Sequence, residues 1–346
     1  MKPVFCIALS VAWLAACGGG ESQRPWPDDL PENPEDGQHF DGKSDPYYEG
    51  WYHKVVLEEQ NEAFFFIYTV VNPLPGSEYP SEAFVYCGRS STLETVYQSF
   101  PAEEYSAAED FRDVRIGEES RATALRFAGR AAEGDDECAW DIWLEEGRHW
   151  PETMGWLTGQ EDLETSWTVG TMHARAEGWV KFKGERIAFE DASGYCDHNW
   201  GVIFPEEWIW LQANSFTGSG AAIAASGGTV DFGESQIEAF MIGLLLDGEV
   251  SAFRTQDLDT IESQAEKGSW QVTGQDETRR ISIEASCDPA SMFDLLVPTP
   301  QGMRPRAWES LNGTLEVTLE SRPGEGQSWE TVYSGTSPFA GVEIGH

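Results

Sequence analysis

Basic residues are scarce in this chain of 346 residues. Lysine and arginine together number 22, against 60 aspartates and glutamates, and the formal net charge is −38. A surface this acidic repels nucleic acid and anionic lipid headgroups. We therefore exclude nucleic-acid binding, and we expect most single acidic side chains to lie on solvated faces.

The sequence also lacks motifs that would reveal several common chemistries. Its six cysteines form no Cys-x-x-Cys pair and show no Cys/His ligand spacing, so no structural zinc and no other metal site is expected. No Gly-x-Ser-x-Gly is present, which leaves a Ser-His-Asp hydrolase without support. His149 and His173 have no acidic or histidine partner at ligand spacing, and a structural role is favoured for both.

No apolar run is long enough to be read as a membrane-spanning helix. Lys2 precedes an apolar run over residues 4–16, which is typical of a targeting segment. The run ends on Leu14-Ala15-Ala16-Cys17, which resembles the bacterial lipobox, so residues 1–16 are expected to be removed and Cys17 to carry lipid. The protein would then be anchored in the cell envelope outside the cytoplasm, and we expect the outer membrane. The alternative is an ordinary signal peptide in which Cys17 has no role.

Residues 17–46 are rich in Gly, Pro, Asp, Glu and Ser and poor in apolar residues, which predicts a lipidated, disordered tether. His39 falls in this tether and His346 at the terminus, so neither is a site candidate. In an exported chain, Cys87, Cys138, Cys196 and Cys287 could form two disulfides, with three possible connectivities.

The remaining residues predict an all-β fold of barrel or sandwich type, because aromatic and β-branched runs alternate with turn residues. Lys183-Gly184, Asp247-Gly248 and Asn312-Gly313 are predicted as hairpin turns. Only residues 102–111 and 289–295 favour short helical turns. These observations agree with two β halves, over 47–160 and 161–346, and an echo of Glu49-Gly50-Trp51-Tyr52 in Glu177-Gly178-Trp179-Val180 supports the division. Ligand sites favour such junctions.

The most informative stretch runs from residue 195 to 216. Its first part contains Asp197 beside His198, and its second is a predicted strand from Trp208 to Phe216. Alternate strand positions share a face, so Trp208, Trp210, Gln212, Asn214 and Phe216 would line one side. Large aromatics mixed with amides suit the wall of a pocket for a mostly apolar ligand.

Three segments resemble the tocopherol cyclase family of plants, cyanobacteria and bacteria. They are Tyr48-Glu49-Gly50-Trp51-Tyr52, residues 194–216 with Asn199-Trp200-Gly201 and Phe204-Pro205, and the closing Val342-Glu343-Ile344-Gly345. The resemblance implies a two-part lipocalin-like β fold, distantly similar to carotenoid hydratases. It also implies closure of a chroman ring on a prenylated hydroquinone, an isomerisation that needs no cofactor or metal.

This chain departs from the family where Asp197-His198 replaces the usual Glu-Lys pair. The resemblance implies that Asp197 donates a proton to an alkene and that His198 orients it or relays the proton. In an extended strand the two side chains would face opposite ways, whereas a bend near Asn199 and Gly201 would bring both into the pocket. Alternatively, the pair only ties down a turn.

The other candidate site residues are aromatic or amide-bearing. Trp200, Trp208 and Trp210 would stabilise a carbocation through their ring faces, or else belong to the core. Gln212 and Asn214 would hold phenolic hydroxyls, or pair with backbone groups. The remaining candidates for the pocket are Glu49, Trp51, Tyr195, Asn199 and Phe204. Glu49, Trp51 and His53 share a strand face that forms either a second pocket wall or, for the polar side chains, a rim facing water.

Three functions remain open from the sequence. The first is a tocopherol cyclase-like isomerase acting on a prenyl quinol or another isoprenoid. The second is a non-catalytic carrier of an apolar isoprenoid or lipid, since lipocalin-like barrels often bind without reacting. The third is an isoprenoid hydratase, in which water replaces the phenol. We expect a monomer in each case.

Overall fold

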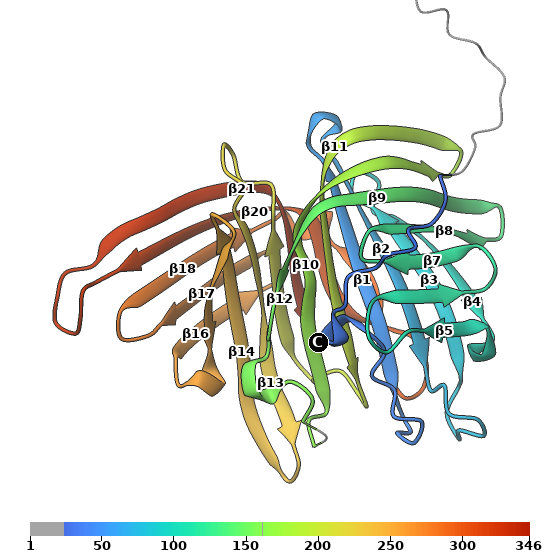
Figure 1. Ribbon diagram of the computed structural model, residues 1–346, viewed down its shortest axis with the longest axis horizontal. Helices are drawn as coiled ribbons and strands as arrows, with labels where there is room; N and C mark the ends of the chain where they lie inside the picture. Colours follow the sequence, from blue (N-terminus) through green and yellow to red (C-terminus); the bar gives the residue numbers. More distant parts are fainter. Residues whose placement is uncertain (1–23, 161) are drawn as a thin grey trace, which may run out of the picture.

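The computed structural model describes residues 24–160 and 162–346, and Cys17 with the targeting segment lies outside them. These residues form two antiparallel β-sheets, one of them curled into a half-barrel, which confirms the predicted all-β fold (Figure 1). Helical structure among them is limited to 3-10 turns of three residues each: η1 Pro34–Asp36, η2 Glu58–Gln60, η3 Ala102–Glu104, η4 Gly155–Leu157, η5 Thr255–Asp257 and η6 Pro289–Ser291. No helix in the described part of the chain is long and apolar enough to cross a membrane.

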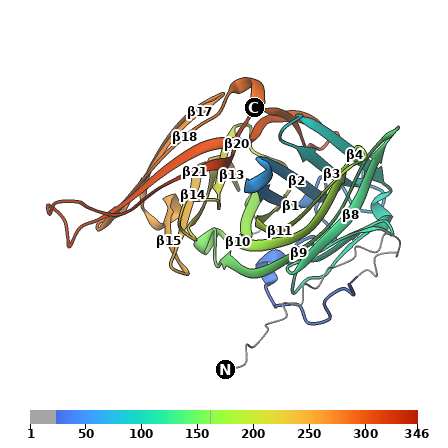
Figure 2. The same cartoon turned by 90° about the horizontal axis from the view of Figure 1, so that it is seen from above.

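The first sheet contains the strands β1 to β11 in the order β4-β3-β2-β1-β11-β10-β9-β8-β7-β6-β5. Their bounds are β1 Tyr48–Leu57, β2 Glu62–Val71, β3 Glu82–Arg89, β4 Glu94–Phe100, β5 Tyr105–Ala107, β6 Asp113–Ile116, β7 Ser120–Thr123, β8 Arg126–Glu133, β9 Asp136–Trp150, β10 Thr165–Phe182 and β11 Glu185–Gly201. Figure 2 shows this sheet curling round its own interior. The strands β1 and β11, which carry many of the predicted site residues, are neighbours in the interior of this order.

The second sheet contains β12 to β21 in the order β15-β14-β13-β12-β21-β20-β18-β17-β16, with β19 paired to β20. Their bounds are β12 Trp208–Ala213, β13 Ala222–Phe232, β14 Ser235–Leu246, β15 Glu249–Arg254, β16 Thr260–Glu266, β17 Ser269–Gln275, β18 Arg279–Ser286, β19 Phe293–Val297, β20 Arg304–Ser321 and β21 Glu330–Gly345. The chain passes between the sheets at residues 202–207. The sequence predicts this junction near residue 160, which instead falls between β9 and β10 of the first sheet.

Two of the three predicted hairpin turns are confirmed. Lys183-Gly184 joins β10 to β11, and Asp247-Gly248 joins β14 to β15. The prediction for Asn312-Gly313 is wrong, because both residues lie inside β20, where the pairing with β21 shifts register between Ser310 and Gly313. Leu311 and Leu315 are buried on either side of the pair, so the apolar face continues through it. Burial of this apolar face stabilises the strand through the local shift in register, although the sequence there favours a turn.

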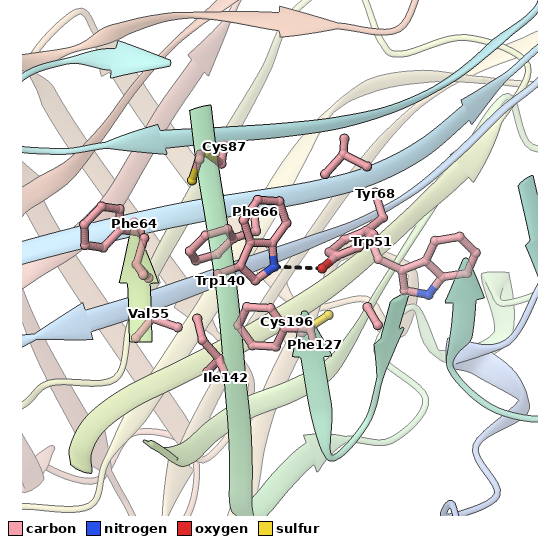
Figure 3. Packing of buried hydrophobic residues seen from close by; sticks show 14 of the residues in the cluster. Trp51, Val55, Phe64, Phe66, Tyr68, Cys87, Phe127, Trp140, Ile142 and Cys196 are labelled. Carbon is pink, nitrogen blue, oxygen red and sulfur yellow. Dashed lines mark hydrogen bonds between the residues drawn. The ribbon is translucent and has the colours of Figure 1, made fainter. Parts of the chain in front are cut away.

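The core of the first sheet fills the inside of its curl (Figure 3). Phe66 and Phe127 pack there around Trp140, whose indole N–H donates to the Tyr68 hydroxyl over 2.8 Å. A second apolar cluster belongs to the other sheet and contains Ile209, Leu211, Ala213 and Phe216. Phe216 therefore departs from the predicted row with Trp208 and Trp210, because β12 ends at Ala213 and the alternation ends with it.

The four cysteines among the described residues are unpaired, so the two disulfides that the sequence left possible are absent. Cys87, Cys138 and Cys196 lie on β3, β9 and β11 of the first sheet, and Cys287 follows β18 of the second. With three thiols on one sheet and one on the other, two disulfides within the chain would require a bond between the sheets. Burial raises the pKa of the Cys87 and Cys196 thiols, which keeps them protonated.

The segment that precedes β1 is packed against the first sheet, which differs from the predicted tether. The Asp36 side chain is buried and forms an ion pair with the buried Arg112 over 2.6 Å. The Trp51 indole N–H donates to the Asp36 carbonyl over 3.1 Å. Residues 34–40 therefore belong to the folded protein and bury side chains of β1 and β11.

Candidate active site

A cavity of about 140 Å3 lies between the two sheets. Aromatic and aliphatic side chains line most of it, and three carboxyl groups interrupt this apolar lining. The main contributors are Tyr48, Tyr52, Met154, Trp167, Asp197, Asn199, Phe204, Trp208, Trp210, Met241, Leu295, Glu309 and Glu343. The lining thus combines apolar surface with a few convergent polar groups, as ligand sites usually do.

Asp197 enters this cavity from β11 with its two carboxyl oxygens in different surroundings. Oδ2 accepts hydrogen bonds from Trp167 Nε1 at 3.0 Å, Trp210 Nε1 at 2.9 Å and the Tyr195 hydroxyl at 3.0 Å. Oδ1 is buried and has no partner among the described residues. Burial raises the pKa of Asp197 to about 6, although the three donors act in the opposite direction.

His198 lies on the opposite face of the same strand. β11 is extended through residue 201, so the bend that would have brought both side chains into the pocket is absent. The His198 ring stacks on Trp51 with centroids 4.2 Å apart, and its Nε2 lies 3.1 Å from Glu49 Oε1. Burial lowers the pKa of His198 to about 3, so its ring is neutral.

A buried polar network surrounds His198 inside the half-barrel. Glu49 also accepts the His39 backbone N–H at 2.7 Å, and burial raises its pKa to about 7. The His39 ring stacks on Trp200 with centroids 3.8 Å apart. His53 lies on this face too, fully buried 3.4 Å from Arg112 Nη1, so the prediction that it faces water at a rim is wrong. His39, which the sequence sets aside, is part of this network.

The predicted site residues therefore separate into three groups. Those on the cavity are Asp197, Asn199, Phe204, Trp208 and Trp210, with Tyr195 joined to it through its hydrogen bond to Asp197. Those on the opposite face of the first sheet are Glu49, Trp51, His198 and Trp200. Gln212 and Asn214 are buried beside the cavity without lining it: Gln212 accepts a hydrogen bond from Lys54, and Asn214 donates to the Gly194 carbonyl.

The last strand makes room for two indole rings. One face of β21 carries the alternate residues Gly341, Glu343 and Gly345, and Glu343 lines the cavity. A Cβ atom at Gly341 would lie 2.5 Å from the Trp210 ring, and one at Gly345 would lie 2.2 Å from the Trp208 ring. The missing side chains let both rings lie against the strand, on either side of Glu343.

Three charged groups of the cavity region were not predicted as site residues. Glu309 and Glu343 are direct partners across β20 and β21, and burial raises the pKa of both. Lys54 is also buried, and its Nζ donates to Gln212 Oε1 at 3.0 Å and to the Phe339 carbonyl at 2.7 Å. Desolvation lowers its pKa to about 7. The sequence could have indicated Glu309, because it alternates with Ala307 and Leu311 and so places an acid on an otherwise apolar strand face.

The arrangement suits proton transfer to and from an apolar molecule. It provides protonated or readily protonated carboxyls in a mostly apolar cavity, with indole rings beside them. Within residues 24–160 and 162–346, no group of three or more histidine, cysteine, aspartate or glutamate side chains is placed to hold a metal ion.

A family model described as tocopherol cyclase-like matches residues 96–346, which is most of the chain. The chain belongs to the tocopherol cyclase-like family. Its similarity to curated members extends further toward the N-terminus. It is 25% identical to a probable chloroplastic tocopherol cyclase of Oryza sativa subsp. japonica, over 90% of this chain and 78% of that protein. It is also 25% identical to the chloroplastic tocopherol cyclase of Zea mays, over 90% of this chain and 77% of that protein.

Solved structures with the same overall fold are more distant in sequence. Kievitone hydratase from Nectria haematococca superposes with a TM-score of 0.51 at 12% identity, over 86% of this chain and 88% of that one. A putative AttH from Nitrosomonas europaea gives a TM-score of 0.51 at 15% identity, over 92% of this chain and 98% of that one. These likenesses concern the fold of the tocopherol cyclase-like chain alone.

Proposed function

We propose that this protein closes a chroman ring on a prenylated hydroquinone by protonating the alkene of the prenyl chain. Membership in the tocopherol cyclase-like family supports an apolar isoprenoid substrate. The observation that carries the proposal is the environment of Asp197, a residue that lines the cavity: three donors hold one of its carboxyl oxygens, and the other is buried without a partner among the described residues. Burial keeps a proton available near neutral pH, and the three donors stabilise the carboxylate that forms when the proton leaves.

The aromatic lining supports the second part of the reaction. Protonation of the alkene leaves a tertiary cation, and the indoles of Trp208 and Trp210 line the space beside Asp197. A ring face within reach of a desolvated cation contributes about 0.5–2 kcal/mol. The phenol oxygen then attacks the cation and closes the ring.

The test is incubation of the full chain with several hydroquinones that carry a prenyl chain, followed by mass spectrometry of the products. We expect chroman from at least one of them, and its loss by about 10²-fold or more in Asp197→Asn. Asp191→Asn is the matched control, because Asp191 is exposed on the same strand. Chroman formation that survives Asp197→Asn would overturn the proposal.

The same experiment distinguishes the two other functions. A hydratase would yield the tertiary alcohol, two hydrogens and one oxygen heavier than the quinol. A carrier would return the quinol unchanged while retaining it in native mass spectrometry, and Asp197→Asn would leave that retention as it was.

We further propose that Cys17 carries a lipid that holds the protein at a membrane of the cell envelope, where an apolar isoprenoid would be concentrated. The Leu14-Ala15-Ala16-Cys17 sequence supports this proposal. Expression with and without Cys17→Ser, followed by membrane fractionation, tests it. A wild-type protein found in the soluble fraction would contradict it.

A further inference from the structure

Asp197 and Glu309 share one feature: each has one hydrogen-bonded carboxyl oxygen and one buried oxygen without a partner among the described residues. Glu309 accepts a hydrogen bond from the Tyr52 hydroxyl on one oxygen, Oε1, and its other oxygen, Oε2, is buried without a partner among the described residues. Both carboxyls line the same cavity. A buried carboxyl oxygen without a donor is costly, which points to a ligand donor at each position.

The strand registers place these two carboxyls on opposite sheets. Tyr52 pairs with Asp197 across β1 and β11, and Glu343 pairs with both Trp210 and Glu309 across β12, β21 and β20. Tyr52 of the first sheet donates to Glu309, and Trp210 of the second donates to Asp197. A molecule between the sheets therefore meets one carboxyl on each side.

We propose that Glu309 is the base that removes the hydroxyl proton of the substrate during ring closure. This inference rests on the proposed function, in which Asp197 supplies the proton to the alkene. The Asp197 O–H bond breaks as a C–H bond forms. The phenol oxygen then forms the C–O bond to the cation, and its O–H bond breaks as the proton passes to Glu309 Oε2. The product is an isomer of the substrate, and one proton has moved from Asp197 to Glu309.

The charges around Glu309 favour its ionised form over that of its neighbour. Glu309 and Glu343 face each other across two strands, and two buried carboxylates in that position repel, so one of the pair keeps its proton. The buried Lys54 acts on Glu309 and favours its carboxylate. Glu343 accepts a hydrogen bond from the Trp208 indole N–H, but burial and the charge of Glu309 both raise its pKa. Glu309 is therefore the acceptor and Glu343 the neutral member of the pair.

Removing the base should separate the two halves of the reaction. In Glu309→Gln the cation still forms, but the oxygen attack is slowed because no group takes its proton. The cation then loses a proton from carbon to the Asp197 carboxylate and returns to an alkene. In D2O, this return leaves deuterium in the recovered hydroquinone or moves its double bond.

The experiment uses the full chain, 2-geranyl-1,4-hydroquinone in D2O, and mass spectrometry of both product and recovered quinol. In Glu309→Gln we expect the rate of chroman formation to fall by about 10²-fold or more. Deuterium should still enter the recovered quinol, at a rate within about tenfold of the rate at which the wild type protonates the alkene. Glu309→Asp, which keeps a carboxylate, should recover part of the ring closure. Thermal unfolding followed by circular dichroism shows that each variant is folded.

One matched variant carries the same chemical change away from the cavity. Glu316→Gln, exposed on the same strand as Glu309, should leave both readouts unchanged. Ring closure at the wild-type rate in Glu309→Gln would overturn the proposal. If Glu309→Gln does not fold, the test falls to Glu309→Asp. The proposal is overturned if this variant closes the ring no faster than Asp197→Asn does.

Failure of the base can be told from failure of the proposed function. Full activity in Asp197→Asn would reject the cyclase mechanism itself, whatever Glu309 does. Loss of both deuterium entry and ring closure in Asp197→Asn, together with normal ring closure in Glu309→Gln, would reject the base alone.

Discussion

Tyr52 and Trp210 meet edge to face between the two sheets, with ring centroids 5.4 Å apart. Each ring donates its polar hydrogen to a carboxyl on the sheet opposite its own, Tyr52 to Glu309 and Trp210 to Asp197. This pair of aromatic side chains therefore couples the packing of the sheets to the protonation of Glu309 and Asp197. Variants that remove either donor should change acid strength as well as packing.

Trp210→Phe should raise the pKa of Asp197 above about 6, because it removes a donor that stabilises the carboxylate. A hydrogen bond to a charged group contributes about 1.5–3 kcal/mol, which corresponds to roughly 1–2 pH units. Infrared titration of the protonated carboxyl, compared with Asp197→Asn, measures the change. Trp208→Phe serves as the control, since its indole donates to Glu343 instead. An Asp197 pKa that stays near 6 in Trp210→Phe would contradict the role of this bond.

Gly341→Ala should disturb the hydrogen bond from Trp210 to Asp197 by pushing on the indole ring. A Cβ atom there would lie 2.5 Å from Trp210, so the indole must move away from β21. We expect a loss of about 1–3 kcal/mol in the free energy of unfolding and an upward shift in the pKa of Asp197. Gly324→Ala is the control, because a Cβ atom at that position would meet open space, with no contact within 4 Å beyond its chain neighbours. Urea unfolding at one pH measures the stability, and equal effects in the two variants would refute the prediction.

Asp197→Asn should stabilise the protein more at pH 8 than at pH 4. The folded-state pKa of Asp197, about 6, exceeds its ordinary value of 3.8. Stability from the protonated group is therefore complete below 3.8 and is lost as the pH rises through 6. Asparagine does not ionise, so the difference between variant and wild type should grow by up to about 3 kcal/mol between these pH values. Urea unfolding at both pH values measures it, and a constant difference would be the contrary outcome.

His198→Gln should reduce stability and leave ring closure within about threefold of wild type per folded molecule. His198 lies on the face away from the cavity, where it contacts Glu49 and stacks on Trp51. Loss of a buried hydrogen bond costs about 1–3 kcal/mol of unfolding free energy. Chemical denaturation and turnover are measured on the same preparation. A turnover loss like that of Asp197→Asn, at normal stability, would instead support the proton relay suggested by the resemblance.

Asp36→Asn should lower the free energy of unfolding by about 3–5 kcal/mol, because it leaves the buried Arg112 without its carboxylate. Glu145→Gln is the control, since Glu145 and its partner Arg175 are both solvent-exposed and such pairs contribute about 1 kcal/mol or less. Thermal or urea unfolding distinguishes them. Equal small effects would show that residues 34–40 contribute little to the stability of the fold.

Local alternation described the strand around Asp197 and left one question open. In an extended strand Asp197 and His198 would face opposite ways, whereas a bend would bring both into the pocket. The structure has the extended strand, with Asp197 on the cavity and His198 on the other face. The placement of His39 in a disordered tether was wrong, because composition describes the average polarity of a segment and does not predict that one ring stacks on a distant tryptophan.

The partners of the acids could not be predicted in the same way. Tyr52 and Glu309 are 257 positions apart, and they meet only because β1 and β20 belong to sheets that pack face to face. The wrong hairpin at Asn312-Gly313 has a related cause, since the pairing of β20 with β21 overrides a local turn signal.

The amino-acid sequence by itself determined the all-β class, the family, and the presence of an acid in an aromatic strand environment. These depend on local alternation and on residue identity, which the chain carries without reference to its partners. Only the tertiary structure decided which acids share a cavity, which donors hold them and which side of the sheet His198 occupies. Proton affinity depends on burial and on neighbouring charges within a few ångströms, and these neighbours come from strands far apart in the chain.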